Sequence, residues 1–121
     1  MDIENSKAQM RKGILEYCIL AVISGKAAYA SDIIERMKEA HLLVVEGTLY
    51  PLLTRLKNDG LLNYQWEESR SGPPRKYYSL TPEGSNFLRV LNMSWEELVR
   101  AVHKITQDII PDITANNDQK Q

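Results

Sequence analysis

The spacing of apolar residues changes period within residues 46–80, and this change constrains the fold more than any other feature of the chain. The first part predicts a short amphipathic helix, because its leucines fall within about 60° of Leu49 around a helical wheel. Pro51 fits this helix if Gly47 or Thr48 is the N-cap, since a proline in the first turn removes an N–H that has no intrahelical partner. An Asn-Asp-Gly sequence then stops the helix. The leucines of the stripe are Leu49, Leu52, Leu53 and Leu56.

The second part alternates apolar and polar residues, which is the period of a half-buried strand. Leu62, Tyr64 and Trp66 share one face of the first predicted strand. Tyr78 and Leu80 share one face of the second. The sequence Ser-Arg-Ser-Gly-Pro-Pro between them has the composition of a turn. A β-hairpin is therefore predicted directly after the short helix.

Two further helices are predicted before this segment and one after it. The first covers residues 8–24 and is apolar nearly all round after Gly13, so we expect it to be buried. The second covers residues 31–40, with Ser31 as its N-cap. Thr-Pro-Glu at residues 81–83 opens the last helix with a capping hydroxyl, a proline and an acid. The fold class is thus mainly α with a small β-hairpin, in the order of a winged helix-turn-helix, whose third helix enters the DNA major groove.

The last predicted helix has apolar residues at alternating steps of three and four, which is a coiled-coil-like seam about three heptads long. Pro111 ends this helix, and we expect the polar residues after it to be disordered. The seam consists of Leu88, Leu91, Trp95, Leu98, Val102, Ile105 and Ile109.

The overall composition is that of a soluble globular protein, with 43% apolar and 26% charged residues in a chain of 121. The single cysteine, Cys18, fits a reducing compartment. The longest apolar run, residues 14–23, is about half of the roughly 20 residues that a membrane span needs. A cytoplasmic protein with no membrane segment is therefore expected.

The net charge of −1 argues weakly against a nucleic-acid partner, because contacts to phosphates need Lys and Arg. The distribution of charge matters more than its sum. Residues 49–80 carry five basic and three acidic side chains, whereas residues 81–121 carry four and six. The segment with the short helix and the hairpin is therefore mildly basic.

The polar face of the short helix and the tip of the hairpin are the candidate DNA-binding groups. The helix offers Tyr50, Thr54, Arg55 and Asn58, with Thr48 and Lys57 beside them, and these types bond base edges and phosphates. The alternative is an ordinary solvated face. Arg70, Arg75 and Lys76 flank the turn and suit a phosphate backbone or a minor groove, the alternative being a solubilising turn.

Other functional classes have little support in the sequence. His41 and His103 have no cysteine or carboxylate cluster near them with the spacing of metal ligands, so no metal is expected. Cys18 is expected to be a small core residue. No nucleophile–base set and no phosphate-cradling glycine loop is visible, so neither an enzyme nor a cofactor is predicted.

Two long motifs, "GTLYPLLTRLKNDGLL" and "GPPRKYYSLTPEG", closely resemble the PadR-like transcriptional regulators, and the resemblance covers residues 13–102. It implies a homodimeric repressor whose third helix and wing bind a palindromic double-stranded DNA operator. In the smaller branch of that family, one long C-terminal helix forms the dimer. The organisation expected is a DNA-binding domain at 1–80, a dimerisation helix at 81–110 and a disordered tail at 111–121.

The resemblance also assigns residues. Tyr29 opens the second helix and could reach a phosphate, although the family usually has glycine where this chain has Ala30. The predicted dimer interface consists of Leu88, Leu91, Trp95, Leu98, Val102 and Ile105. The predicted DNA-binding residues are Tyr29, Thr48, Tyr50, Pro51, Thr54, Arg55, Arg70, Ser71, Gly72, Arg75 and Lys76.

Trp95 stands out on the seam because tryptophan is bulky there and its indole N–H needs a partner. One interpretation is a core or dimer-interface anchor. The other is the wall of an effector site, in which two Trp95 rings across a two-fold axis sandwich a planar, phenolic or drug-like compound. The function predicted is a repressor that such an effector releases; the alternative is a winged-helix module that binds another protein and has no sequence-specific DNA binding.

Overall fold

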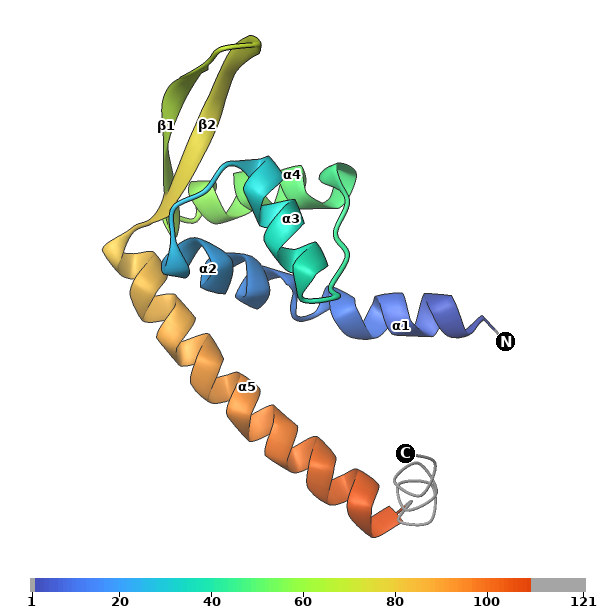
Figure 1. Cartoon of the computed structure of the whole chain (residues 1–121). Coiled ribbons are helices and arrows are strands. Elements are labelled where there is room, and N and C mark those ends of the chain that lie inside the picture. Colours follow the sequence, from blue (N-terminus) through green and yellow to red (C-terminus); the bar gives the residue numbers. More distant parts are fainter. Residues whose placement is uncertain (1, 110–121) are drawn as a thin grey trace. The chain divides into compact units, whose positions relative to one another are not determined.

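The computed structural model describes residues 2–109, and in this range it contains five helices and one antiparallel hairpin (Figure 1). The order of helices, hairpin and long final helix confirms the predicted winged helix-turn-helix class. The chain divides into two compact units, residues 1–89 and 90–121, with the boundary inside the last helix. The predicted tail at 111–121 lies outside the described residues. The elements are α1 (Ile3–Lys12), α2 (Leu15–Gly25), α3 (Ala30–Glu39), α4 (Glu46–Asn58), β1 (Leu62–Ser69), β2 (Gly72–Leu80) and α5 (Pro82–Ile109).

The first predicted helix, residues 8–24, is in fact two helices that meet at Gly13 and Ile14. Helix α1 begins before the predicted start, because Asp2 caps it by accepting a hydrogen bond from the Asn5 N–H at 3.1 Å. None of its residues is buried. Helix α2 buries only part of its surface, at Leu15, Ile19, Leu20 and Ile23, so burial follows one side of the helix rather than the whole of it.

The core of the first unit is built from one side of each of α2, α3 and α4 together with the base of the hairpin. Most of its members are aliphatic, and each fully buried side chain of this size stabilises the fold by about 1.5–3 kcal/mol. Helix α4 supplies this core with the leucine stripe that the sequence predicted. The largest fully buried side chains are Ile19, Leu20, Ile33, Leu49, Leu53, Leu56 and Leu62.

Helix α3 begins one residue earlier than predicted, and its N-cap is Tyr29 rather than Ser31. The Asp32 carboxylate accepts a hydrogen bond from the Tyr29 N–H at 3.1 Å, which fixes the backbone at this point. Further along α3, the Arg36 guanidinium donates to the carbonyl oxygens of Val22 and Lys26 at 3.4 and 3.0 Å. This arginine therefore donates to carbonyls at the end of α2 and ties α3 to it.

Helix α4 starts earlier than predicted, with Val45 as N-cap instead of Gly47 or Thr48. Pro51 is therefore the sixth helical residue and lies in the second turn, not the first. It removes one intrahelical hydrogen bond, which the packing of the leucine stripe offsets. Gly60 follows the helix with a φ of 80°, the left-handed conformation expected of the stop sequence.

The hairpin pairs β1 with β2 from Leu62 opposite Leu80 outward to a bulge near Ser69. Its base gains a short additional bridge, because Ala28 and Tyr78 exchange backbone hydrogen bonds of 3.0 and 2.8 Å. Farther out, the hairpin extends past the helices (Figure 1). Trp66, expected to be half-buried, is for this reason 62% exposed.

Helix α5 is joined to the first unit through the Thr-Pro-Glu-Gly segment. The Thr81 hydroxyl donates to the Gly60 carbonyl at 2.6 Å and accepts from the Gly84 N–H at 2.9 Å, which confirms its predicted capping role. Gly84 lies so close to the turn after α4 that an added Cβ would be 2.0 Å from the Leu61 carbonyl oxygen. Only glycine allows this contact without moving the backbone.

Candidate nucleic-acid interface

The hairpin, called the wing from here on, has two faces with different side chains. Residues that alternate along a strand point to opposite faces. The pairs Tyr64–Tyr78 and Trp66–Lys76 place three aromatic rings and one lysine on the first face. Gln65, Tyr77, Glu67 and Arg75 pair on the second face. The first face therefore presents a cation beside aromatic rings, and the second presents Arg75 with one ring, Tyr77, and one acid, Glu67.

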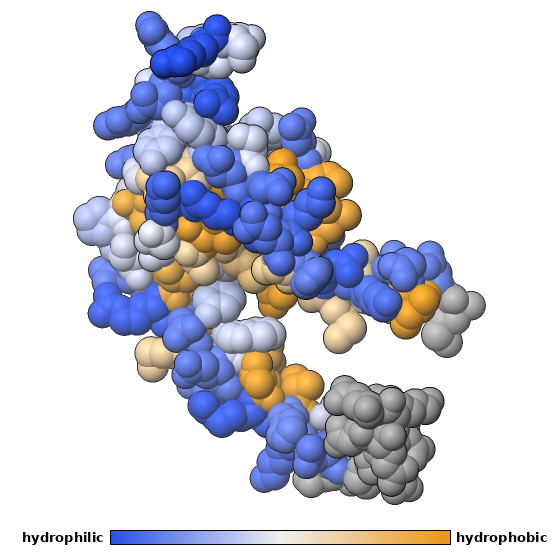
Figure 2. All heavy atoms as spheres, viewed as in Figure 1, coloured by the Kyte–Doolittle hydropathy of each residue, from blue (hydrophilic) through white to orange (hydrophobic). Residues whose placement is uncertain are grey.

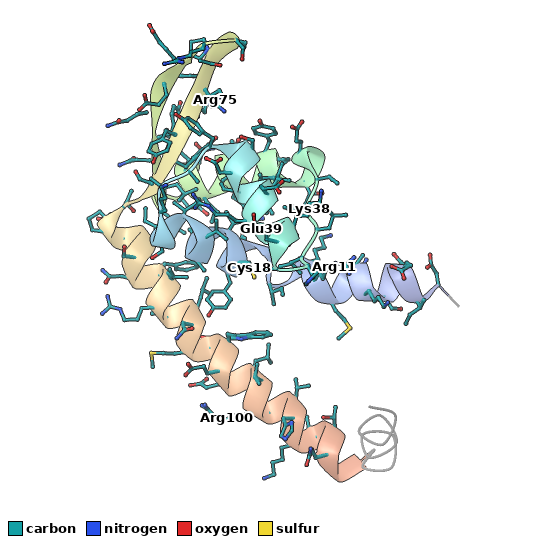
Figure 3. The ribbon with its side chains drawn as sticks, viewed as in Figure 1. Arg11, Cys18, Lys38, Glu39, Arg75 and Arg100 are labelled. Carbon is teal, nitrogen blue, oxygen red and sulfur yellow. The ribbon has the colours of Figure 1, made fainter. Side chains whose placement is uncertain are left out.

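On the second face, Arg75 is held by Tyr29. Its guanidinium carbon lies 4.0 Å from the centre of the Tyr29 ring, a short cation–π contact. The same ring lies 4.9 Å from the Tyr77 ring. The backbone bridge between Ala28 and Tyr78 brings Tyr29 to this position. Arg75 itself is exposed, and Figure 3 labels it on the wing, so its charge is presented to solvent in a fixed orientation.

A hollow of about 390 Å³ lies between the start of α3, α4 and the wing, and we call it the wing groove. It brings together several residues that the sequence assigned to DNA binding. Seven groove residues were not predicted, and two of them have exposed charged or aromatic side chains that the prediction overlooked: Glu46, which opens α4, and Trp66. The exposure of Trp66 was not readable from the alternating pattern, because that pattern does not show where the helices stop covering the strand. The predicted residues that line the groove are Tyr29, Tyr50, Thr54, Arg75 and Lys76.

The remaining predicted residues of α4 lie elsewhere. Thr48 lines a second hollow of about 310 Å³, beside Arg11 and Lys12 of α1. Pro51 is exposed but lines neither hollow. Arg55 forms an ion pair with Glu16 of α2, with 57% and 32% of the two side chains exposed. The outer face of α4 is thus bordered by the wing groove on one flank and by α1 and α2 on the other.

The tip of the wing carries Arg70, Ser71 and Gly72, all of which are exposed and lie outside the groove. The tip therefore forms a separate, projecting contact surface. Four cationic side chains of α4 and the wing form no ion pair with any residue that the structure describes. They are Lys57, Arg70, Arg75 and Lys76.

Tyr78 lies at the floor of the groove and is 4% exposed. Burial raises the pKa of its hydroxyl above the ordinary value, and the neighbouring Tyr50 and Tyr64 raise this pKa further. The phenol therefore stays neutral and keeps its proton as a hydrogen-bond donor. Such a surface, with cations, hydroxyls and ring faces, matches the groups that contact DNA phosphates, sugars and base edges.

The second unit presents a different surface along α5 (Figure 2). Four of the six predicted interface residues are exposed in the single chain: Trp95 at 38%, Leu98 at 55%, Val102 at 50% and Ile105 at 57%. Leu88 and Leu91 are half-buried. Val99, which the seam pattern omitted, is 44% exposed and lies one helical turn from both Trp95 and Val102.

Neither a metal site nor a membrane span is found in the part of the chain that the structure describes. Across residues 2–109, no three His, Cys, Asp or Glu side chains lie close enough together to hold an ion. No described helix is both long and apolar enough to cross a bilayer.

Comparison with known proteins agrees with this geometry. Residues 19–90 match the model of the PadR-like transcriptional regulator family. The chain is 63% identical to a PadR-like transcription factor from Bacteroides fragilis, with a TM-score of 0.71 over 84% of this chain and 98% of that one. A PadR family regulator from Eggerthella lenta is 30% identical, with a TM-score of 0.80 over 87% and 92% of the two chains.

A PadR-like regulator from Bacillus cereus is 36% identical, with a TM-score of 0.71 over 82% of this chain and 97% of that one. The match extends over most of each chain and includes α4, the wing and the start of α5. The chain therefore belongs to the PadR-like family of transcriptional regulators, and it is a DNA-binding regulator of transcription rather than an enzyme.

Proposed function

We propose that the protein is a cytoplasmic repressor that binds a palindromic operator as a homodimer. The observation that carries this proposal is the convergence of α3, α4 and the wing around one groove lined by Tyr50, Thr54, Arg75 and Lys76. The outer face of α4 would enter the major groove, while the wing contacts the backbone or the minor groove beside it. Occupancy of the operator would block transcription sterically.

The homodimer is supported by the apolar surface of α5. Trp95, Leu98, Val102 and Ile105 each keep between 38% and 57% of their surface exposed in the single chain. Covering such a continuous apolar stripe with a second copy removes it from water. A two-fold dimer would place two copies of α4 on half-sites about one helical turn apart, which accounts for a palindromic operator.

The effector would act through Trp95. Trp95 is 38% exposed on α5, so a planar compound between two protomers would contact it. Binding would favour a dimer geometry in which the two α4 helices no longer fit both half-sites. The expected ligand is flat and aromatic, phenolic or drug-like.

DNA binding is tested by mobility shift on the duplex immediately upstream of the protein's own gene, and on duplexes selected by the protein from a random pool. We expect one strongly preferred, palindromic sequence and an affinity that falls steeply as salt rises, because several phosphates are neutralised. Binding without sequence preference, or without salt dependence, would instead favour the alternative of a protein-binding module.

The effector site is tested by quenching of tryptophan fluorescence with a planar aromatic dye. The Trp95→Ala variant should lose the quenching, and the dye should release wild-type protein from its operator. Trp66 also emits and is 62% exposed, so the experiment is done in a Trp66→Phe background. Unchanged dye binding by the Trp95→Ala variant would show that Trp95 is not part of the effector site.

A further inference from the structure

Two lysines from different elements converge on one tyrosine ring. The Lys57 ammonium, from the last turn of α4, lies 5.9 Å from the centre of the Tyr64 ring. The Lys76 ammonium, from β2, lies 4.6 Å from the same ring centre. Sequence reasoning placed Lys76 in the wing and Lys57 beside the α4 face, without connecting them.

The wing holds Lys76 in place from two sides. Its ammonium also lies 5.4 Å from the Trp66 ring, and Trp66 is its direct cross-strand partner. The Tyr64 and Trp66 rings are in edge contact, with their centres 5.8 Å apart. Lys76 is thus positioned before any ligand arrives, which lowers the entropy cost of binding.

Both lysines line the same small hollow, of about 140 Å³, between α4 and the wing, which we call the lysine pocket. Thr54 and Asn58 of α4 and the hydroxyl-bearing Tyr64 and Tyr78 of the wing complete its polar lining. No Asp or Glu is among the described residues that line it. Neither lysine has a carboxylate within ion-pair distance in the described part of the chain.

This arrangement leaves two positive charges without a counter-charge. An aromatic ring attracts a cation only through its quadrupole, which is worth about 0.5–1 kcal/mol at an exposed site. The two ammonium groups also repel each other, because both lysines line the same pocket. An anion between them would relieve the repulsion and could accept hydrogen bonds from both ammonium groups and from a hydroxyl or amide of the lining.

We propose that the lysine pocket is a shared phosphate site, in which Lys57 and Lys76 together hold one backbone phosphate of the bound DNA. The inference rests on the proposed DNA-binding function and deepens it. A phosphate fixed here joins the C-terminal end of α4 to the wing through one point of the DNA backbone. It sets the position of α4 along the groove and adds affinity without reading sequence.

A shared phosphate has a distinctive salt signature. The slope of log affinity against log salt falls by about 0.9 for each phosphate that the protein stops neutralising. Removing one of two lysines on one phosphate leaves that phosphate neutralised by the other. Removing both leaves it without a cation.

The test measures operator binding by the full chain over a range of salt concentrations for Lys57→Gln, Lys76→Gln and the double variant. Each single variant should lose affinity about three- to fivefold with a nearly unchanged slope, and the double variant should flatten the slope by about 1.8, because the dimer on its operator holds one such phosphate in each protomer. Lys38→Gln, in the last turn of α3 (Figure 3), is the matched control and should bind as wild type. Thermal melts check that all four variants fold.

The other outcomes overturn the inference in distinguishable ways. Single variants that each flatten the slope by about 1.8, adding in the double variant, would mean two separate phosphates in each protomer. Unchanged affinity and slope in the double variant would mean that no phosphate binds here, while salt-dependent binding by the wild type would keep the proposed function standing. A wild-type chain that selects no duplex would overturn both.

Discussion

The wing groove of the first unit and the apolar stripe of α5 in the second unit are both exposed, but their chemistry is opposite. The groove combines Arg75 and Lys76 with tyrosine rings and one acid, Glu46. The stripe exposes aliphatic side chains such as Leu98 and Ile105, which are 55% and 57% accessible. Figure 2 shows the contrast, with hydrophilic residues at the end of the wing and hydrophobic ones along α5.

The difference indicates which kind of partner each surface has. Cations held over rings keep their charge available and suit a polyanion that arrives with its own water and counterions. An aliphatic stripe gains free energy only when water is removed from it, so it suits another protein surface. A DNA-binding regulator that works as a dimer needs one surface of each kind.

The largest expected effect concerns the α5 stripe. Leu98→Asp should raise the dimer dissociation constant about a thousandfold, roughly 4 kcal/mol, because each protomer would bury a carboxylate in an apolar interface. Met93→Asp is the matched control, since Met93 is 58% exposed and lies about 140° away around the helix. Light scattering after size-exclusion chromatography measures the mass; a stable dimer formed by the Leu98→Asp variant would refute the dimer helix.

The next effect concerns the junction through which α5 joins the first unit. Gly84→Ala should lower the free energy of unfolding by about 2–3 kcal/mol, because its Cβ would meet the Leu61 carbonyl oxygen at 2.0 Å. Gly25→Ala, where a Cβ meets nothing within 4 Å, should leave stability nearly unchanged. Chemical denaturation compares the free energies of unfolding of the two variants. Equal values would show that the backbone at Gly84 and Leu61 moves apart at little cost.

A smaller effect separates two arginines of the predicted DNA surface. Arg75→Ala should weaken operator binding about tenfold without changing the melting temperature, because Arg75 is exposed in the wing groove. Arg55→Ala should weaken binding less and lower stability by roughly 0.5 kcal/mol, because it also breaks the partly exposed pair with Glu16. If Arg55→Ala weakened DNA binding more than Arg75→Ala, α4 rather than the wing would dominate the affinity.

The smallest effect concerns Cys18 on α2 (Figure 3), which is half-buried and not the core residue that the sequence predicted. Burial raises the pKa of its thiol above the ordinary value of 9.0. The thiol has a higher pKa in the folded protein than in the unfolded chain. The contribution of Cys18 to the free energy of unfolding is therefore fully present below pH 9 and is lost as pH rises through the folded-state pKa. An aromatic disulfide reagent at pH 8 should react more slowly with the Cys18 thiol of the native protein than with that of the urea-unfolded protein. Equal rates would mean that folding does not protect this thiol.

The sequence was most informative where function and stability depend on neighbouring residues. The leucine stripe of α4, the glycine stop after it and the Thr81 cap all follow from local spacing and local hydrogen bonding, and the structure confirms them. The start of α4 was wrong by two or three residues because Val45 caps the helix through its backbone, without a side-chain signal. The break near Gly13 was missed because a single glycine is compatible with a continuous helix.

Contacts between distant segments could not be predicted in the same way. The ion pair of Arg55 with Glu16, the bridge of Ala28 with Tyr78 and the approach of Gly84 to Leu61 each join residues far apart along the chain. No spacing rule relates such residues, because their distance is set by how the helices pack. The same is true of the exposure of Trp66.

The sequence by itself determined most of the elements and their order, together with the leucine stripe of α4 and the apolar spacing of α5, because these depend on residues within a few turns of one another. Only the tertiary structure decided which cations share a site. It placed Arg75 on Tyr29 and brought Lys57 and Lys76 to the same ring. The reason is that electrostatic interactions depend on distance through space, and that distance exists only after α3, α4 and the wing have packed together.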